Sequence, residues 1–587
     1  MTRSGLARAA LLVTLVTLAS RIVGFGRWLA QGYWVGNGTF TDAFNAANLL
    51  PNVLFEVAAG GALAGAVVPL VSGPLSRGTL TGEGTAAARE QASRSASALL
   101  GWTLVVLVPA GGVMALLAGP LANWLVDDPL TDVVAAFLRV FAVQVPMYGI
   151  AVVLGGMLQA HKRFFWPAFS PLISSVVVIG VYWGYAARLP ERGAQDLGDI
   201  PARALDWLAW GITAGVVALA LPLVLPALRT GLRLRPTLRF PDGEGRRAAH
   251  LAFAGVGALV AQQLALVVVM KVGTDLGGYT TWLYAYNVYL LPYAVLAFPI
   301  ATSAFPHFTD HAAAGRLGDL RGLVASTTRT LLVVAAAGVA ALAAAAPAVE
   351  TVFDLLVTGD APGMASALAW MAPGLVGYAL VLHLSRALYA VDHGRAAVVA
   401  TATGWGVMVL GLLATWVAFG GPGGESAGDS SGSPGAPSSS AGFLDGLAVL
   451  DGERGPGLVL GALGVAGTLG MTVAGAGLLI AVRRHLGRAA LAGTGRTGLV
   501  LAAGTALGAL AGYGVGYLLR PPGQRIDPGF VAYPGGDRPF VAGEFLAALG
   551  SGLLAGVVAV VVVLALAALA DSGLRARLRA WAGRAGR

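Results

Sequence analysis

The sequence predicts an all-α polytopic membrane protein with about fourteen transmembrane helices. Of its 587 residues, 56% are hydrophobic and 11% are charged, whereas a soluble globular protein carries about 25% charged residues. The apolar residues form runs of about 20 or more, the length that a helix needs to cross a bilayer. Cysteine is absent, which excludes disulfides, thiolate metal sites and cysteine nucleophiles. These observations together exclude a soluble enzyme.

Each predicted helix is an apolar run that is long enough to span a membrane. In chain order the runs cover residues 9–33, 41–73, 96–120, 131–160, 165–187, 205–228, 248–272, 279–306, 322–349, 362–390, 396–420, 456–482, 497–519 and 545–570. The first run follows Arg3 and Arg8, as the apolar part of a signal peptide would. It is too long for that role and no cleavage site of small residues follows it, so we retain it as the first span.

Basic residues lie mostly on one side of the predicted membrane. With the amino terminus in the cytoplasm, cytoplasmic segments hold 26 of the 38 Lys and Arg residues and outer segments hold 7. This excess of positive charge sets the orientation, and an even number of spans leaves both termini in the cytoplasm. No basic stripe is interleaved with aromatic residues, so nucleic acid is not an expected partner. Anionic membrane lipids are the expected partners of these basic segments.

A loose internal repeat indicates that the chain contains a duplication. Leu49-Leu50-Pro51 in the second span recurs as Leu290-Leu291-Pro292 in the eighth, and Leu158-Gln159-Ala160 recurs as Leu388-Tyr389-Ala390. We therefore predict an N-terminal six-helix lobe over 1–230 and a C-terminal six-helix lobe over 231–485, interrupted by a disordered outer loop at 421–455. Two further helices and a basic cytoplasmic tail follow over 486–587. Prolines at matching places favour a transport site near the midplane, although the alternative is that they only shape helix packing.

Four charged residues lie within the first two spans, where a charge needs a partner, a wet cavity or a path to the interface. At a rise of about 1.5 Å per residue, Arg21 lies ~18 Å along the first helix and Glu56 ~22 Å along the second. Arg27 follows Arg21 by one to two turns, and Asp42 opens the second span. Two hypotheses fit this pattern: the four residues line a polar cavity, or they form two structural ion pairs.

Other basic residues inside spans have simpler explanations, with one exception. Lys271 and Arg386 lie near span ends, where a long side chain can reach the interface. Arg139 lies ~12 Å from the outer face by helical rise and is a further candidate for a cavity.

The sequence contains no pattern typical of an enzyme. The seven histidines form no HExxH pair, and no Gly-rich loop ends in the Gly-Lys-Ser/Thr of a nucleotide-binding loop. A membrane glycosyltransferase is disfavoured because the spans hold few acids, the outer pair Asp127-Asp128 being its main support. We therefore expect a transporter without a cofactor, driven by an ion gradient or the membrane potential. The metal or coupling ion remains unassigned, with Gln262, Gln263 and Asp392 as polar candidates.

The first two spans also carry a specific series of motifs. The first contains SRIVGFGR at Ser20–Arg27; the second contains TDAF at Thr41–Phe44, then Leu50-Pro51-Asn52 and, later, Val68-Pro69. This series resembles the SRxxGFxR, TDAF, LPN and VP signature of the MurJ/MviN family of lipid II flippases, in the MOP exporter superfamily. Supporting similarities lie at Gly156–Phe164 (GMLQAHKRF) and Arg386–Ala390 (RALYA), so the resemblance covers roughly residues 10–485.

The resemblance implies a fold and a function. It implies two six-helix lobes around a central cavity, alternating between inward-open and outward-open forms in the bacterial inner membrane, with the last two helices lining a groove for a lipid tail. The implied cargo is the undecaprenyl-diphosphate-linked disaccharide pentapeptide from which peptidoglycan is built. Arg27 matches a cavity arginine of the family, and Arg21 and Asp42 match further polar positions.

The chain departs from the family at other cavity positions. Phe55 and Glu56 stand where many members have two arginines, and Tyr286 and Asn287 stand where they carry an aspartate–arginine pair. Either Arg139 supplies the missing positive charge, or the substrate contact or the cargo differs. The predicted substrate-binding residues are thus Arg27, Arg21, Asp42, Glu56, Arg139 and Asn287.

Two other functions remain open at this point. The first alternative to a lipid II flippase is an exporter of another lipid-linked saccharide or amphiphile. The second is a non-transporting scaffold that recruits cell-wall synthesis proteins through its basic tail, Arg575–Arg587.

Overall fold

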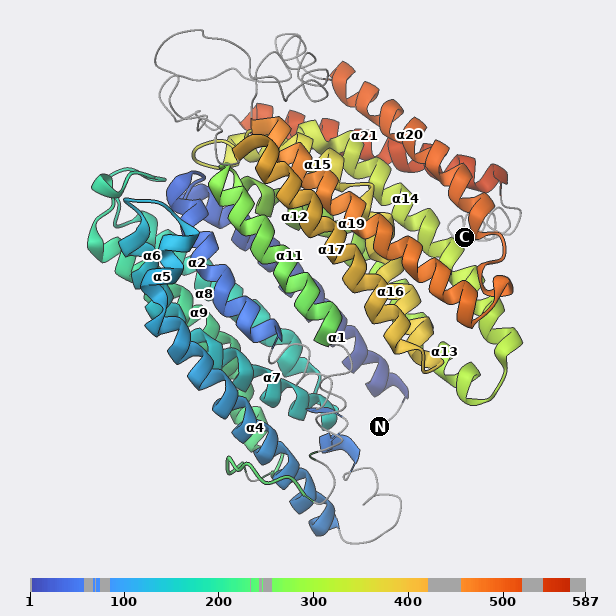
Figure 1. The fold of residues 1–587 in the computed structure, drawn as a ribbon, viewed down its shortest axis with the longest axis horizontal. Coiled ribbons are helices and arrows are strands. Elements are labelled where there is room, and N and C mark those ends of the chain that lie inside the picture. The colour runs from blue at the N-terminus through green and yellow to red at the C-terminus, as the bar shows by residue number, and fades with distance from the viewer. Residues whose placement is uncertain are drawn as a thin grey trace. The chain divides into compact units, whose positions relative to one another are not determined.

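A computed structural model of the chain describes residues 3–57, 67–68, 70–73, 85–232, 234–241, 245, 256–420, 456–519 and 542–570. Every regular element in these ranges is a helix (Figure 1), which confirms the predicted all-α class. The predicted outer loop at 421–455 and the basic tail Arg575–Arg587 lie outside the described residues.

The described helices match the predicted spans closely. Twelve of them are long and apolar enough to cross a membrane, and thirteen if α15 (Met364–Met371) and α16 (Gly374–Ala390), which meet at a bend of 46°, form one span. The predicted span 131–160 has the same ends in the structure. The predicted second span is represented by α2 (Thr39–Phe55), while residues 58–66 of that span lie outside the described ranges.

The chain divides into two compact units. Unit 1 comprises Met1–Gln263 with Val357–Gly359, and unit 2 comprises Leu264–Leu356 with Asp360–Arg587. The division falls inside α11 (Val256–Asp275). The predicted boundaries at residues 230 and 485 remain a prediction.

Unit 1 is built from helices that pack mainly against partners distant in sequence. Its elements are α1 (Arg3–Trp34), α2, α4 (Thr85–Leu116), α5 (Ala118–Leu125), α6 (Thr131–Phe141), α7 (Gln144–Ala160), α8 (Phe165–Ala186), a 3-10 turn (Leu197–Asp199) and α9 (Ala202–Leu228). The main pairings are α1 with α8, α8 with α9, and α7 with both α4 and α9. Rings from α2 and α6 form a buried aromatic cluster, made of Phe40, Phe44, Phe137 and Phe141.

The turn between α1 and α2 is held by a side chain from a distant loop. Gln195 accepts hydrogen bonds from the Thr41 backbone N–H at 3.2 Å and from its hydroxyl at 3.1 Å. Its amide donates to the Val35 carbonyl at 3.0 Å. Gly36 adopts a φ of +92°, and a Cβ there would lie 2.9 Å from the Gln195 amide, so glycine is required on both counts. These contacts place the first turn of α2, and with it Asp42.

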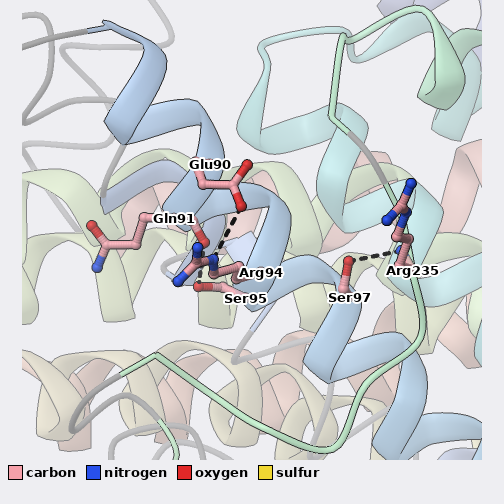
Figure 2. Close-up of polar contacts among 6 residues, drawn as sticks. All are labelled: Glu90, Gln91, Arg94, Ser95, Ser97 and Arg235. Atoms are coloured by element: carbon pink, nitrogen blue, oxygen red, sulfur yellow. Dashed lines mark hydrogen bonds and ion pairs between the residues drawn. The ribbon is translucent and has the colours of Figure 1, made fainter.

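A segment after α9 runs along α4. The Ser97 hydroxyl accepts a hydrogen bond from the Arg235 backbone at 3.0 Å, and Arg94 pairs with Glu90 one turn away at 3.1 Å (Figure 2). Gly101 allows the close approach, because a Cβ there would lie 2.2 Å from the Thr237 carbonyl oxygen. The predicted basic inner segment after residue 228 is therefore ordered against α4 where it is described.

Unit 2 is built around one long helix. It contains the rest of α11, α12 (Tyr279–Pro292), a π-helical turn (Tyr293–Ala297), α13 (Phe298–Ala313), α14 (Leu317–Leu356), α15, α16, α17 (Gly394–Gly420), α19 (Pro456–His485), a 3-10 turn (Arg488–Leu491), α20 (Thr494–Leu519) and α21 (Ala542–Ala570). The alanine-rich middle of α14 suits this central place, because alanine favours helix and lets neighbours approach closely. Ala336, Ala340 and Ala344 are all buried there.

The two C-terminal helices pack against α14 through a stripe of glycines on α20, and Figure 1 shows α20 and α21 beside α14. The glycines recur every fourth residue, at Gly504, Gly508, Gly512 and Gly516. A Cβ on Gly512 would lie 2.4 Å from the Ala555 carbonyl oxygen and 2.7 Å from the Ala344 Cβ. Backbones can approach this closely only where side chains are minimal.

The two units share an irregular element. In unit 1, Pro51 lies inside α2 and a π-helical turn begins at Glu56. In unit 2, Pro292 ends α12 and a π-helical turn covers Tyr293–Ala297. Proline removes a backbone donor and interrupts the hydrogen-bond ladder of a helix, so the repeated Leu-Leu-Pro motif accompanies the same local break in both units.

Candidate functional site

The site in unit 1 centres on Arg27, which α1 presents to neighbouring helices. Its side chain is half-buried, and its guanidinium carbon lies 5.7 Å from the centroid of the Trp28 ring. The Trp28 ring of the same helix is thus the aromatic group that the geometry places near Arg27.

A buried neutral network lies one turn beyond Arg27. The Tyr182 hydroxyl donates to the Gln31 side-chain oxygen at 3.3 Å, and the Gln31 amide donates to the Asn45 side-chain oxygen at 2.9 Å. Gln31, Asn45 and Tyr182 are each at most 5% exposed. A satisfied buried network specifies one packing arrangement, so these bonds fix α1, α2 and α8 around Arg27.

A second aromatic contact joins α2 to α7. The Phe55 ring stacks on the Tyr148 ring with a centroid distance of 4.8 Å and an interplanar angle of 28°. Tyr148 is half-buried, and its hydroxyl makes no hydrogen bond with the described residues. The stack thus fixes the Tyr148 ring of α7 against the end of α2.

The predicted ion pairs are absent from the described part of the chain. Neither Arg21 nor Arg27 forms an ion pair there with Asp42 or Glu56. Arg21 is exposed and Glu56 is half-buried. Asp42 is 5% exposed, in the first turn of α2, where the positive end of the helix dipole favours a carboxylate. Of the two hypotheses for these four residues, the one with structural ion pairs is therefore wrong.

The remaining predicted site residues lie elsewhere. Arg139 is exposed in the last turn of α6, where a cation is favourable; Phe137 and Phe141 of the same helix are buried. Asn287 belongs to unit 2, where its amide donates to the Leu283 carbonyl of its own helix at 2.8 Å. The role of Arg139 as a second cavity arginine stays a prediction.

Unit 2 carries an aromatic stripe at the positions where the family pattern expects charge. Trp282 stacks on Tyr286 at 4.9 Å with an interplanar angle of 9°. Tyr378 of α16 faces the same stripe, with its ring 4.7 Å from that of Tyr293 and edge-on to it at 81°. Tyr378 also packs against Tyr289, with ring centroids 6.4 Å apart and an interplanar angle of 75°. The stripe itself is uncharged.

The intramembrane basic residues of unit 2 each have a partner group. Lys271 pairs with Asp275 one turn away. Arg386 lies near the Phe298 and Phe305 rings, at 5.8 Å and 5.9 Å. One of its guanidinium nitrogens is fully buried without a hydrogen bond, and its extension to the interface stays a prediction. No group of three or more metal-binding side chains occurs in the described ranges.

The sequence predicted Arg27 as a binding residue but gave no indication of the neutral polar residues on the neighbouring helices. Gln31, Asn45, Tyr148 and Tyr182 are uncharged, and a neutral polar residue in an apolar span gives only a weak signal. One usable signal was the spacing of Gln31, four residues after Arg27, which places both on one face of α1.

Comparisons with known proteins agree with this fold. Residues 32–423 match the family model described as Lipid II flippase MurJ. The chain is 27% identical over 293 residues to the lipid II flippase MurJ of Burkholderia cenocepacia, covering 47% of this chain and 51% of the relative. It is 30% identical over 231 residues to a probable lipid II flippase MurJ of Rhizobium meliloti, covering 38% and 40%. The matched region thus spans about half the length of these curated relatives, or less.

Solved structures show the same architecture. A lipid II flippase MurJ in an inward closed conformation superimposes with a TM-score of 0.62 at 16% identity, covering 94% of this chain and 98% of the other. An inward-facing multidrug resistance MATE family transporter of the MOP superfamily superimposes with a TM-score of 0.56 at 13% identity, covering 82% and 98%. At these identities the likeness establishes the fold.

Proposed function

The chain belongs to the lipid II flippase MurJ family, and on this premise we propose that it carries lipid II across the bacterial inner membrane by alternating access. The cargo in this proposal is the undecaprenyl-diphosphate-linked precursor of peptidoglycan. The family match over residues 32–423 and the fold likeness over 94% of the chain support it.

The observation that carries the proposal is the unpaired guanidinium of Arg27. It is half-buried in a membrane-spanning helix and has no carboxylate partner among the described residues. A charge in this setting is costly unless a ligand or water accompanies it. The diphosphate of the cargo supplies the complementary charge, and a guanidinium binds such oxygens with two parallel hydrogen bonds.

The rest of the cargo fits the character of the helices. A polyprenyl tail can remain in lipid while the polar part crosses, and the family resemblance assigns the tail to a groove along the last two helices. Large apolar side chains of α20 and α21 are exposed, among them Leu507, Leu510, Leu546, Leu553 and Val557. No covalent bond changes in this process, so we propose transport without catalysis, driven by an ion gradient or the membrane potential.

The proposal also includes location and partners. We place the protein as a multi-pass inner-membrane protein with both termini in the cytoplasm, on the charge distribution of the sequence. Its proposed partners are lipid II, the surrounding membrane lipids and cell-wall synthesis proteins.

Complementation of a flippase-depleted bacterium tests the function. We expect the wild-type chain to restore growth, Arg27→Ala to fail, and Arg94→Ala to restore growth, because Arg94 is an exposed residue paired with Glu90. All three variants are compared at equal membrane abundance. If Arg27→Ala rescues as well as the wild type does, transport does not depend on this charge; if the wild-type chain itself fails to rescue, the scaffold hypothesis is favoured.

A second candidate function is the export of another lipid-linked saccharide. The neutral residues at 55, 286 and 287 favour it, because they replace charged positions of the family. An assay in vesicles separates the two candidates: this second function predicts that lipid II stays on the inner leaflet while a different lipid-linked sugar crosses.

A further inference from the structure

His383 is a titratable side chain inside a membrane-spanning segment, and the diphosphate site does not include it. It lies in α16, the second helix of the bent pair that α15 and α16 form, and is 0% exposed. An ionisable side chain in such a place is costly, and in transporters it marks an ion or proton pathway. Histidine is also the side chain whose charge changes near neutral pH.

Hydrogen bonds to α14 assign the tautomer of the His383 ring. The Thr327 hydroxyl donates to the Leu323 carbonyl at 2.7 Å, one turn earlier in its own helix. A hydroxyl has a single hydrogen to donate, so at 3.0 Å from His383 it accepts from Nε2. Nε2 therefore carries the ring proton, and Nδ1 carries a lone pair. Nδ1 is buried and has no hydrogen-bond partner among the described residues, so a basic nitrogen is left unused between the helices.

The groups around His383 leave a protonated ring without a counterion. The Phe308 ring of α13 packs edge-on against it, with ring centroids 5.5 Å apart and an interplanar angle of 64°. Arg386 follows one turn later on α16, and one of its guanidinium nitrogens is likewise buried without a hydrogen bond. His383 forms no ion pair within the described ranges, and Asp310 of α13 and Asp319 of α14 are exposed.

The other acids and bases on the elements packed against α16 do not change this balance. Glu350 and Asp354 of α14 accept from backbone N–H groups near the start of α15. The described parts of α17 and α19 contain no acid, and their titratable residues are exposed at helix ends: Arg395, Arg483, Arg484 and His485. The half-buried titratable groups on the π-helical turn, α13 and α14 are a phenol and bases: Tyr293, His311, Arg321 and Arg329.

A neutral ring suits this packing, and an imidazolium does not. Protonation of Nδ1 adds a second buried cation one turn from Arg386 with no carboxylate to neutralise it, which is costly. The cost falls where water reaches the ring, so an added proton favours an arrangement in which α13 and α16 separate. α13 begins directly after the π-helical turn Tyr293–Ala297, and an interruption of this kind is where a helix bends.

We propose that His383 binds a proton at Nδ1 and thereby couples transport to the proton gradient. The proposal rests on the proposed function, for which it names the driving ion. The proton enters from water on one face of the membrane, converts the imidazole into an imidazolium, and leaves to water on the other face after access has changed.

Vesicles that contain the full-length chain test the coupling, with lipid II transport as the readout. Potassium and valinomycin hold the membrane potential at zero, so that a pH gradient is the only driving force. We expect the gradient to accelerate transport by the wild type about fivefold or more. His383→Gln has no titrating nitrogen, so the acceleration should disappear. His307→Gln is the matched control, because His307 is exposed on α13, and it should be accelerated as the wild type is.

Amide hydrogen exchange in lipid nanodiscs gives a measurement that does not need transport. After correction for the intrinsic pH dependence of exchange, we expect the amides of α13 and α16 in the wild type to exchange several-fold faster as the pH falls from about 8 to about 5. His383→Gln should show no such change. Thermal unfolding at neutral pH confirms that the variant is folded.

The outcomes separate the proton site from the proposed function. If the wild type transports lipid II at the same rate with and without the gradient, or if His383→Gln keeps the acceleration, the proton site is overturned and the flippase function stands. If the wild type transports no lipid II, the proposed function fails. In that case pH-dependent exchange that requires His383 still supports the proton site, and pH-independent exchange overturns it.

Discussion

Unit 1 and unit 2 contain the same local break and use it to present different chemistry. Each has a Leu-Leu-Pro motif followed by a π-helical turn. Each also has a tyrosine held by an aromatic ring from that helix region: Tyr148 by Phe55 at 4.8 Å, and Tyr378 by Tyr293 at 4.7 Å. The interval from Tyr148 to Tyr378 equals that from Leu158 to Leu388 in the repeated motif.

The difference lies in where the cation sits. In unit 1 Arg27 lies near the Trp28 ring of its own helix. In unit 2 the neighbours of Tyr378 are other tyrosines, and Arg386 lies near two phenylalanine rings. The two units therefore share a backbone irregularity but differ in the charged side chains near it. The functional charge depends on single side chains, and the helix break depends on proline.

The largest expected effect comes from reversing the charge in unit 1. Arg27→Glu places a carboxylate where the proposed diphosphate binds, so both attraction and hydrogen bonding are lost. We expect no growth rescue in the flippase-depleted strain and binding of undecaprenyl diphosphate weakened by more than about a hundredfold. Retained binding of undecaprenyl diphosphate would show that unit 1 does not bind the anion through Arg27.

The next effect concerns the extra helices that only unit 2 carries. Gly512→Leu forces a side chain into the Ala555 carbonyl, since even a Cβ would lie 2.4 Å from it. We expect destabilisation by about 2 kcal/mol or more, seen as a lower thermal unfolding temperature. At Gly514 nothing lies within 4 Å of an added Cβ, so Gly514→Leu is the matched control and should unfold as the wild type does.

A third prediction compares polar groups in the two units. Gln31→Leu leaves the buried Tyr182 hydroxyl of unit 1 without its acceptor, which costs about 1–3 kcal/mol. Asn287→Leu in unit 2 removes a bond to the carbonyl of its own helix from a half-buried residue, so the expected loss is smaller. Equal losses in chemical or thermal unfolding would contradict this distinction.

Adding charge to unit 1 should sharpen the contrast. Glu56 is half-buried and forms no ion pair within the described residues. Glu56→Arg replaces a negative with a positive charge near the diphosphate, and we expect precursor binding to tighten several-fold by native mass spectrometry. Glu56→Gln should give an intermediate affinity, because it removes the repulsion and adds no cation. An unchanged affinity in both variants would place Glu56 outside the site.

The smallest effect is expected for the tyrosine of unit 2. Tyr378→Phe keeps the ring and removes a hydroxyl whose neighbours are other tyrosines, so diphosphate binding should change by less than about twofold. A loss of about tenfold or more would show that the tyrosines of unit 2 contact the anion.

Several features of this protein could be read from the sequence by itself. The composition and the apolar runs predicted a polytopic helical protein, because the bilayer imposes a minimum length and polarity on each span. The motifs around Arg21, Arg27 and Asp42 identified the family, and the free-energy cost of a charge inside the membrane pointed to these three residues and Glu56 as candidates. The four-residue spacing of glycines on α20 is also visible in the sequence, but the residues that pack against these glycines, such as Ala555 and Ala344, are not.

Only the tertiary structure decided which neutral groups meet between the helices. The stack of Phe55 on Tyr148 joins α2 to α7, and the bond from Tyr182 to Gln31 joins α8 to α1. It also showed that Arg27 has no ion pair with Asp42 or Glu56 in the described chain. Hydropathy depends on each segment alone, whereas the environment of a neutral polar side chain depends on which helix packs opposite, and that is settled only when the helices assemble.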